Sequence, residues 1–468
     1  MVFSSIIFLF TFLPITLLLY YVSPRILKNS ILLIASLVFY AWGEPVYVFL
    51  MIGTILADYF LAILIDKNKH DEGKCKFIFI LTIIFNVSIL GFFKYFGFFI
   101  DNINSIFHVN IPFEGLALPI GISFYTFQVL SYIVDVYLGK VEVQHNIINF
   151  ATYVTMFPQL VAGPIVQYQT IETQLNTRKE SVIKFGEGVE RFIQGLGKKV
   201  LLANNIGMLW TTVSAMEMSS ISVLTAWLGI IAYTFQIYFD FSGYSDMAIG
   251  LGKMFGFDFM ENFNYPYISK SITEFWRRWH ISLGTWFREY IYIPLGGNRV
   301  SMPKQIRNIF VVWCLTGFWH GASWNFVIWG LYYGVLLFLE KFALKSVLEK
   351  LPDSIKHIYT MLLVIIGWLF FASEDLGFAV EYLKVMFFIS GNAVIDNAGI
   401  FYLYTNIVMM IILFVFSTPV IKQILENIAR EYRDKLLNPS LVIYGLVLFL
   451  VTAYLVNETY NPFLYFRF

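Results

Sequence analysis

Charged residues are scarce in this chain. Only 13% of its 468 residues are Asp, Glu, Lys or Arg, whereas 58% are hydrophobic. A water-soluble core cannot hide so large an apolar fraction, which excludes an ordinary soluble globular protein. The net charge of +1 also excludes a nucleic-acid surface as a main feature, because such a surface needs clustered positive charge. The composition indicates that membrane lipids are the main surroundings of the chain.

Cysteine is nearly absent. Cys75, in an expected polar loop, and Cys314, in an apolar run, have no spacing typical of a disulfide or a metal site. We expect no metal site and no bound cofactor. Linkers rich in proline, glycine or serine are absent as well, which predicts one membrane domain over residues 1–468.

Apolar runs follow one another along the chain, and roughly 20 apolar residues suffice for a helix to cross a bilayer. We count eleven or twelve such runs and expect an all-α, multi-pass membrane protein. The first run has neither the basic start nor the cleavage site of a secretory signal, so we expect it to remain as a span. The expected spans are 2–22, 29–43, 46–65, 76–100, 118–138, 186–212, 222–243, 308–322, 325–342, 358–373, 400–420 and 440–457.

Lys and Arg gather in alternate loops, which indicates the loops that face the cytoplasm. With an outside N-terminus and twelve spans, both termini lie outside, and residues 457–468 form an extracytoplasmic tail. The cytoplasmic loops would carry Arg25, Lys28, Lys67, Lys69, Lys74, Lys76, Lys140, Arg178, Lys179, Lys184, Lys341, Lys345, Lys350, Lys356, Lys422, Arg430, Arg433 and Lys435.

Two stretches do not fit simple spans. Residues 150–168 are apolar but interrupted by Pro158, Gly163 and Pro164, which predicts a re-entrant or kinked element that lines a cavity. Residues 266–307 are too polar to span and interleave seven Lys or Arg with aromatic residues. This pattern predicts helices that lie in the cytoplasmic interface and contact membrane lipids.

One histidine lies inside an apolar run. His320 occurs in Phe318-Trp319-His320-Gly321, and an ionisable group at membrane depth usually lines a cavity and serves function. Gly317 and Gly321 flank it and would allow a ligand or another backbone to come close. A neutral imidazole could act as a general base for a hydroxyl group. The alternative is a histidine that only satisfies a neighbouring carbonyl.

A second histidine ends a run of aromatic and basic residues. His280 follows Trp276, Arg277, Arg278 and Trp279, and on a helix its neighbours three and four positions back would be Arg277 and Trp276. For an anionic donor that bears phosphate, Arg277, Arg278 and Arg288 would supply charge-assisted hydrogen bonds. The arginines could equally bind lipid headgroups, and His280 could merely anchor the helix.

Polar residues also close the seventh expected span, where Asp240 and Tyr244 are one helical turn apart and Asp246 follows. They could tune a histidine, but we favour a packing role in which polar groups satisfy one another between helices. The loop 294–299 is rich in glycine but lacks the lysine and serine of a phosphate-binding loop.

Taken together, these residues resemble the membrane-bound O-acyltransferase family, in particular its bacterial branch that O-acetylates alginate, cellulose or peptidoglycan. The similarity covers most of the chain. It is carried by the stretches 40–42, 238–246, 262–267, 271–280, 294–299 and 317–321.

The resemblance implies a helical assembly, with shorter tilted helices around a central funnel, in a bacterial cytoplasmic membrane. It implies acetyl-CoA as the cytoplasmic donor substrate, an extracellular polysaccharide or peptidoglycan as acceptor, and an extracytoplasmic esterase-like transferase of the SGNH type as partner. His320 matches the family's essential catalytic residue, and His280 matches its second polar position.

Other functions remain open at this point. A D-alanyl transferase acting on teichoic acid is similar to this branch but takes its donor from a carrier protein; loop 294–299 and the run 276–280 favour acetylation. A branch that acylates secreted proteins is a weaker alternative. A lipid or solute transporter should show internal repeats, which this sequence lacks. A scaffold without chemistry gives no reason for a histidine in an apolar run.

The last residues carry one more resemblance. Phe463, Tyr465 and Phe468 are spaced as in the C-terminal motif of a small membrane peptide that accompanies the D-alanylation relative, where a tyrosine is thought to carry the acyl group. The resemblance implies that Tyr465 accepts acetyl with help from His320. The alternative is an aromatic anchor at the membrane interface.

Overall fold

The structure, a computed structural model, describes residues 1–431, 439–457 and 464. All regular elements in these ranges are helices, as the composition predicts. Packing divides the chain into two compact units. Unit 1 comprises Met1–Phe192 and Met247–Met260, and unit 2 comprises Ile193–Asp246 and Glu261–Phe468. The single domain over 1–468, with 266–307 and 457–468 as parts of it, stays a prediction.

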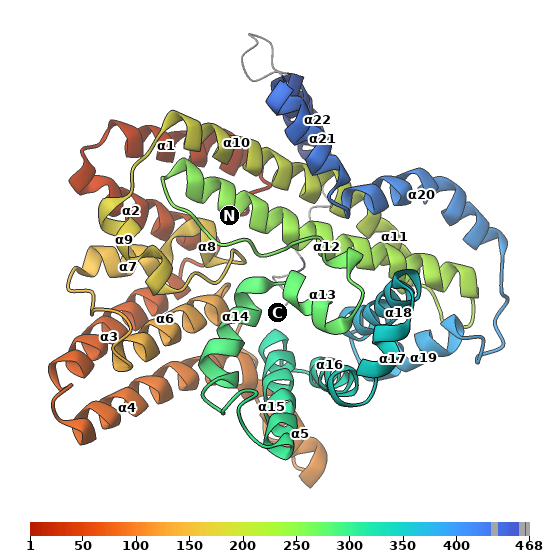
Figure 1. Cartoon of the computed structure of the whole chain (residues 1–468), viewed down its shortest axis with the longest axis horizontal. Coiled ribbons are helices and arrows are strands. Elements are labelled where there is room, and N and C mark those ends of the chain that lie inside the picture. The colour runs from red at the N-terminus through yellow and green to blue at the C-terminus, as the bar shows by residue number, and fades with distance from the viewer. Residues whose placement is uncertain (432–438, 458–463, 465–468) are drawn as a thin grey trace. The chain divides into compact units, whose positions relative to one another are not determined.

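In the described residues, the regular elements of unit 1 are all helices (Figure 1). Cys75 is buried in the first turn of α4 and not in a polar loop. The elements are η1 (Phe8–Phe12), α1 (Leu13–Val22), η2 (Arg25–Leu27), α2 (Lys28–Ala41), α3 (Tyr47–Lys67), α4 (Glu72–Leu90), η3 (Gly91–Tyr95), α5 (Phe96–Phe107), α6 (Ile122–Tyr137), α7 (Ile147–Thr155), α8 (Phe157–Leu160), α9 (Tyr168–Thr177) and most of α10 (Val182–Gly197).

The stretch 150–168 is broken, as its prolines predict. α7 ends before Met156, and the four-residue α8 begins at Phe157 with Pro158 in its first turn. A proline is tolerated there, because an amide N–H in the first turn would have no acceptor within the helix. Phe157, Pro158 and their neighbours are buried within unit 1. A wholly lipid-facing span is therefore excluded for this segment, and the cavity it was expected to line stays a prediction.

Unit 2 contains the segments that carry the candidate site residues (Figure 1). Its elements are η4 (Lys198–Ala203), α11 (Asn204–Ser214), α12 (Val223–Met254, which ends in unit 1), η5 (Pro266–Ile268), α13 (Ile272–Arg278), α14 (Ile281–Phe287), η6 (Arg288–Tyr292), α15 (Met302–His320), α16 (Trp324–Phe342), α17 (Lys345–Lys350), α18 (Asp353–Ala372), α19 (Leu376–Met386), α20 (Asn397–Phe416), α21 (Val420–Glu431) and α22 (Pro439–Asn457).

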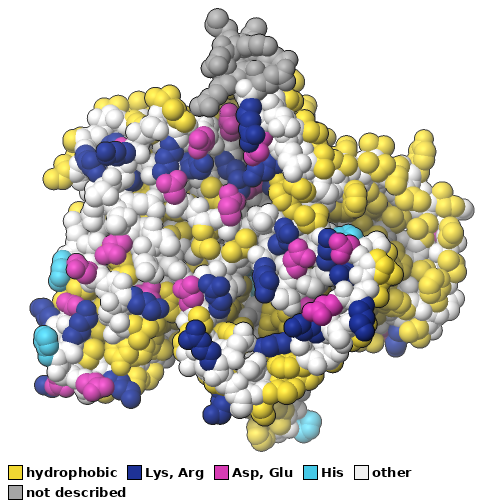
Figure 2. All heavy atoms as spheres, in the orientation of Figure 1, with side chains coloured by type: hydrophobic (Ala, Val, Ile, Leu, Met, Phe, Trp, Pro, Cys, Tyr) yellow, Lys and Arg dark blue, Asp and Glu magenta, His cyan; other side chains and the backbone are white. Residues whose placement is uncertain are grey.

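Within the described residues, six helices are long and apolar enough to cross a membrane. They are α3, the continuous helix Glu72–Phe107, α12, α18, α20 and α22. Hydrophobic side chains cover the surface over α20 (Figure 2). The chain is thus a multi-pass membrane protein. The number of eleven or twelve spans stays a prediction, because expected spans such as 2–22 and 186–212 fold as successive shorter helices.

Candidate active site

His320 is the last residue of α15, and Gly321 ends the helix in an extended conformation. α16 begins at Trp324 and packs along α15. A Cβ atom on Gly317 would clash with the backbone of Phe326 and Gly330 on α16. The predicted close approach beside His320 is therefore made by another backbone. This close backbone contact holds α15 and α16 together next to the turn that contains His320.

The imidazole of His320 lies in an aromatic enclosure and is only 3% exposed. Its ring centroid lies 4.9 Å from that of Trp319, 5.0 Å from that of Trp329 and 5.1 Å from that of Phe371. These rings come from α15, α16 and α18. Such an enclosure excludes bulk water, which strengthens any hydrogen bond or proton transfer made by the ring.

His280 lies at a sharp break between two short helices. α13 ends at Arg278, Trp279 is extended, and His280 adopts the left-handed conformation (φ 46°) before α14 begins. A non-glycine residue in this conformation is under backbone strain, which is often stored at functional sites. The expectation that His280 continues a helix, with Arg277 and Trp276 beside its ring, is wrong in this respect.

Hydrogen bonds select the tautomer of His280, and burial sets its charge. The side-chain oxygen of Asn262 accepts hydrogen bonds from the Ser282 amide at 3.1 Å and the Ser282 hydroxyl at 2.9 Å, and it lies 3.2 Å from Nδ1 of His280. Nδ1 is therefore the donor, which places the lone pair of the neutral ring on Nε2. Burial lowers the pKa of His280 to about 3, so this ring is neutral at physiological pH.

Trp319 connects the two histidines. Its ring centroid lies 6.1 Å from that of His280 and 4.9 Å from that of His320, so the two imidazoles lie within about 11 Å of each other. On its other side, His280 contacts Phe241 of α12 at 4.7 Å between ring centroids. The structure thus brings together three stretches that the sequence singles out separately.

The acidic residues of α12 pair with two lysines that sequence reasoning missed. Lys199 Nζ lies 2.5 Å from Asp240 Oδ1, and Lys198 Nζ lies 2.6 Å from Asp246 Oδ2. Tyr244 is buried one turn beyond Asp240. The lysines lie in the π-helix η4, a form that is frequent at functional sites. Two adjacent lysines near the middle of the expected span 186–212 were the signal that could have identified them.

The N-terminus of α13 is held by a residue of α16. The buried carboxylate of Glu340 accepts hydrogen bonds from the amide of Ile272 at 2.7 Å and from the amide and hydroxyl of Thr273 at 2.9 and 2.8 Å. It satisfies amides that a helix start leaves without intrahelical partners. Sequence reasoning missed Glu340, whose position in an apolar run was the available signal.

The three candidate donor-binding arginines lie toward solvent. Arg277 and Arg288 are exposed, while Arg278 is partly buried and forms an ion pair with Glu274 at 2.9 Å. Further charged side chains gather over α17 and the adjoining ends of α16 and α18 (Figure 2). The aromatic residues between the arginines are buried instead: Trp279 contacts Trp368 with ring centroids 4.6 Å apart. The run 276–280 therefore has a polar face and a packed aromatic face.

Leu464, near the C-terminus, lies in the same region. The amide of Leu464 donates a hydrogen bond to Asp240 Oδ2 at 3.0 Å. Tyr465, the candidate acyl carrier, lies outside the described residues. Its role stays a prediction.

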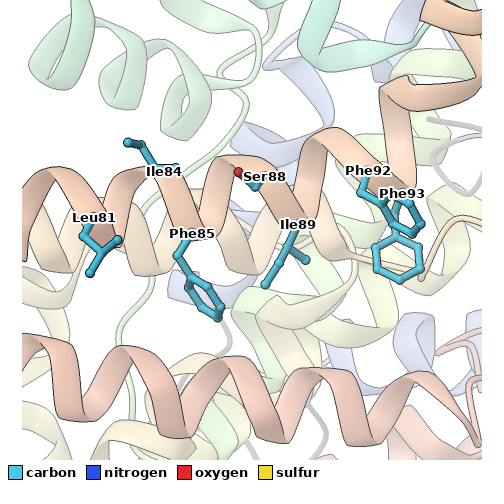
Figure 3. A pocket seen from close by; sticks show the side chains of 7 residues that line it. All are labelled: Leu81, Ile84, Phe85, Ser88, Ile89, Phe92 and Phe93. Carbon is cyan, nitrogen blue, oxygen red and sulfur yellow. The ribbon is translucent and has the colours of Figure 1, made fainter.

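A groove of about 440 Å³ in unit 1 offers no comparable chemistry (Figure 3). It runs along α4 and its continuation, and it contains no titratable side chain. Its lining residues are Leu81, Ile84, Phe85, Ser88, Ile89, Phe92 and Phe93. It lacks the acid–base groups that acyl transfer requires.

Comparison with known proteins identifies the family. The profile of the membrane-bound O-acyltransferase family matches residues 140–372, which include both histidines. The probable alginate O-acetylase AlgI of Pseudomonas aeruginosa is 46% identical over 392 residues, which cover 83% of this chain and 75% of that protein. The chain belongs to the membrane-bound O-acyltransferase family and is an O-acyltransferase.

Two further relatives bear on the acceptor. The peptidoglycan O-acetyltransferase of Helicobacter pylori is 35% identical over 426 residues, covering 84% of this chain and 80% of that protein. The teichoic acid D-alanyltransferase of Bacillus subtilis is 31% identical over 252 residues, covering 50% of this chain and 62% of that protein.

Proposed function

We propose that this protein transfers acetyl groups from acetyl-CoA at the cytoplasmic face of a bacterial cell membrane for O-acetylation of an extracellular polysaccharide or peptidoglycan. The observation that carries the proposal is the pair of buried histidines on either side of Trp319. Relatives named as alginate and peptidoglycan O-acetylating proteins support the acyl group and the glycan acceptor.

His320 acts as the general base. Its imidazole accepts the proton of a hydroxyl group as the hydroxyl oxygen attacks the carbonyl carbon of the acetyl thioester. The carbon–sulfur bond then breaks, and the thiol of CoA leaves with a proton returned from the imidazole. The aromatic enclosure supports this role because it keeps water from competing as the nucleophile. His280, held neutral by burial and oriented by Asn262, orients or polarises the reacting groups.

Arg277, Arg278 and Arg288 bind the phosphates of the donor. Arg277 and Arg288 are exposed, and Arg278 balances part of its charge against Glu274. Asp240, Tyr244 and Asp246 support the site from α12. Guanidinium groups recognise phosphate with paired hydrogen bonds, which suits a nucleotide-containing thioester.

Tyr465 is the first acceptor of the acetyl group in this proposal. Its phenol attacks the thioester, and the acetyl-tyrosine passes the group to an extracytoplasmic esterase-like transferase, which completes the transfer to the glycan. CoA itself then never crosses the membrane. The Leu464 contact with Asp240 supports this arrangement, because it holds the backbone amide of Leu464, the residue before Tyr465, against α12.

The donor is tested with purified protein in lipid vesicles. Radiolabelled acetyl-CoA, added on the side that carries the arginines, should label the protein or release CoA, whereas a D-alanyl carrier protein should not serve as donor. Adding an alginate-type polysaccharide or peptidoglycan fragments with the secreted transferase then identifies the acceptor. Labelling from the D-alanyl carrier protein alone would establish the alternative, teichoic acid D-alanylation. That alternative is favoured less because the D-alanyltransferase match covers only 50% of this chain.

A further inference from the structure

The hydrogen bond between Leu464 and Asp240 joins a residue near the C-terminus to the middle of α12, 224 residues earlier in the chain. α22 ends at Asn457, and Leu464 follows seven residues later. An extended chain advances at most about 3.6 Å per residue, so the segment can travel about 25 Å from the helix end. That length exceeds half of a bilayer core of roughly 30 Å. Seven residues are therefore long enough to cover half the thickness of such a core.

Asp240 lies near the middle of the long helix α12. It is 17 residues from the start and 14 residues from the end of α12, which spans Val223–Met254. At about 1.5 Å per residue, more than 20 Å of helix lies on each side. The side chain is almost fully buried, with its residue only 1% exposed. A carboxylate in this position is costly unless it is paired and hydrogen-bonded.

Each carboxylate oxygen of Asp240 has its own partner. Oδ1 lies 2.5 Å from Lys199 Nζ, which also donates to the side-chain oxygen of Asn204 at 2.9 Å. Oδ2 accepts the amide of Leu464 at 3.0 Å. Lys199 therefore supplies the countercharge, while the second oxygen takes up the C-terminal backbone.

We propose that the Lys199–Asp240 ion pair is a binding site for the backbone of the C-terminal segment at Leu464, with Asp240 as a positioning residue. The site recognises a main-chain amide, so it tolerates changes of the Leu464 side chain. It lies beside the histidines, since the next residue, Phe241, contacts the ring of His280. The inference adds to the proposed function but does not depend on it, because docking requires no acyl group on Tyr465.

The opposing interpretation is that the ion pair only joins η4 to α12. The two interpretations differ in what happens to residue 464 when the charges are removed together. In the double variant Lys199→Met/Asp240→Leu, apolar side chains of similar size replace the pair, a change that proteins often tolerate. Asp240→Asn is milder, since it retains one acceptor oxygen and loses the charge.

The experiment measures the rate at which a maleimide reagent labels Leu464→Cys in the full chain. Cys75→Ser and Cys314→Ser remove the two native thiols. We expect slow labelling with Asp240 intact and labelling about tenfold faster or more in the double variant, because a hydrogen bond to a charged group is among the stronger ones. Asp240→Asn should give an intermediate rate. Asp58→Asn is the matched control: Asp58 is equally buried in unit 1, where it accepts a hydrogen bond from Asn86.

Equal labelling rates in the parent, the double variant and Asp240→Asn would overturn the proposal, provided that the unfolding temperature in detergent shows folded protein. Asp240→Asn keeps the test decisive if the double variant does not fold. Tyr465→Phe, combined with Leu464→Cys, should still label slowly. Loss of acetylation without faster labelling in that variant supports the carrier role of Tyr465 separately, and normal acetylation with slow labelling refutes the carrier role but leaves docking intact.

Discussion

The carboxylate of Glu340 on α16 accepts the hydroxyl hydrogen bond of Thr273 on α13 at 2.8 Å. This contact joins the helix that follows the His320 turn to the helix that precedes His280. The spacing of the two histidines therefore depends on a residue that contacts neither of them.

Glu340→Gln should weaken the contact between α13 and α16. The amide retains one acceptor oxygen but turns its NH2 group toward backbone donors, which leaves a buried amide poorly satisfied and costs about 1–3 kcal/mol of stability. The unfolding temperature in detergent should fall, and kcat should fall more than KM rises, because the catalytic geometry is disturbed. Glu349→Gln, at an exposed position on α17, is the control and should leave both unchanged. Unchanged kcat and stability in Glu340→Gln would refute the positioning role.

His320→Ala and His320→Gln should lower acetylation by about 10² to 10⁴, the usual value of general-base catalysis. Initial rates with acetyl-CoA, on protein shown to insert normally, provide the measurement. His280→Ala should have a smaller or equal effect. The control is His70→Gln in an exposed loop. If His280→Ala alone abolished activity, the two roles would be reversed.

Charge reversal at Arg277 and Arg278 should raise the apparent KM for acetyl-CoA more than it lowers kcat, because the pairs serve binding. The effect should shrink as salt increases, since exposed charges are screened. Arg278→Glu should be the more disruptive, because it also faces Glu274. Lys422→Glu, an exposed change on α21, controls for surface charge. An unchanged KM would identify these arginines as lipid contacts.

Tyr465→Phe keeps the aromatic ring and removes the nucleophilic hydroxyl group. We expect glycan acetylation to be lost, together with any acetyl label on the protein, since no oxygen remains to accept the group. Tyr454→Phe on α22 is the matched control and should be neutral. Near-normal glycan acetylation by Tyr465→Phe would reduce this tyrosine to an interfacial anchor.

His280 should make the folded protein sensitive to acid. Burial lowers its pKa to about 3, whereas an unfolded histidine has a pKa of about 6.5. The unfolded chain therefore binds a proton that the folded chain does not, and stability that is fully present above pH 6.5 is lost as the pH falls. The loss is about 1.4 kcal/mol per pH unit. His280→Asn should lose less stability than the wild type between pH 7 and 5 in detergent unfolding; parallel curves would argue against a buried neutral ring.

The sequence predicts where helices form better than it predicts the contacts between them. Apolar runs and prolines determine where helices form and break, so the start of α12 and the interruption at Pro158 follow from local patterns, whereas α12 continues to Met254, beyond the expected end at residue 243. The break at His280 does not follow from them, because its left-handed backbone is held by Asn262, 18 residues away. The contact of Glu340 with α13 does not follow from local patterns either, because Glu340 is 68 residues from Ile272 and 67 residues from Thr273. Such partners are chosen by tertiary packing, which local patterns do not encode.

Lys198 and Lys199 also have partners that local sequence patterns do not predict. Their charges are visible in the sequence, but the carboxylates that neutralise them lie on a different helix. The sequence favours a packing role for Asp240 and Asp246, and in the structure the two carboxylates pair with lysines of η4. Helical spacing alone identified Asp240 and Tyr244 as neighbours, but it could not identify a partner outside their helix.

The Lys199–Asp240 pair also has an electrical consequence. A single uncompensated charge at mid-membrane would respond to the membrane potential by about 2.3 kcal/mol for every 100 mV across its full path. Opposite charges 2.5 Å apart cancel in that field, as do Lys198 and Asp246. The paired charges in the centre of this enzyme should therefore not move when the membrane potential changes. Collapse of the potential by an ionophore should leave the rate of acetyl transfer in sealed vesicles unchanged.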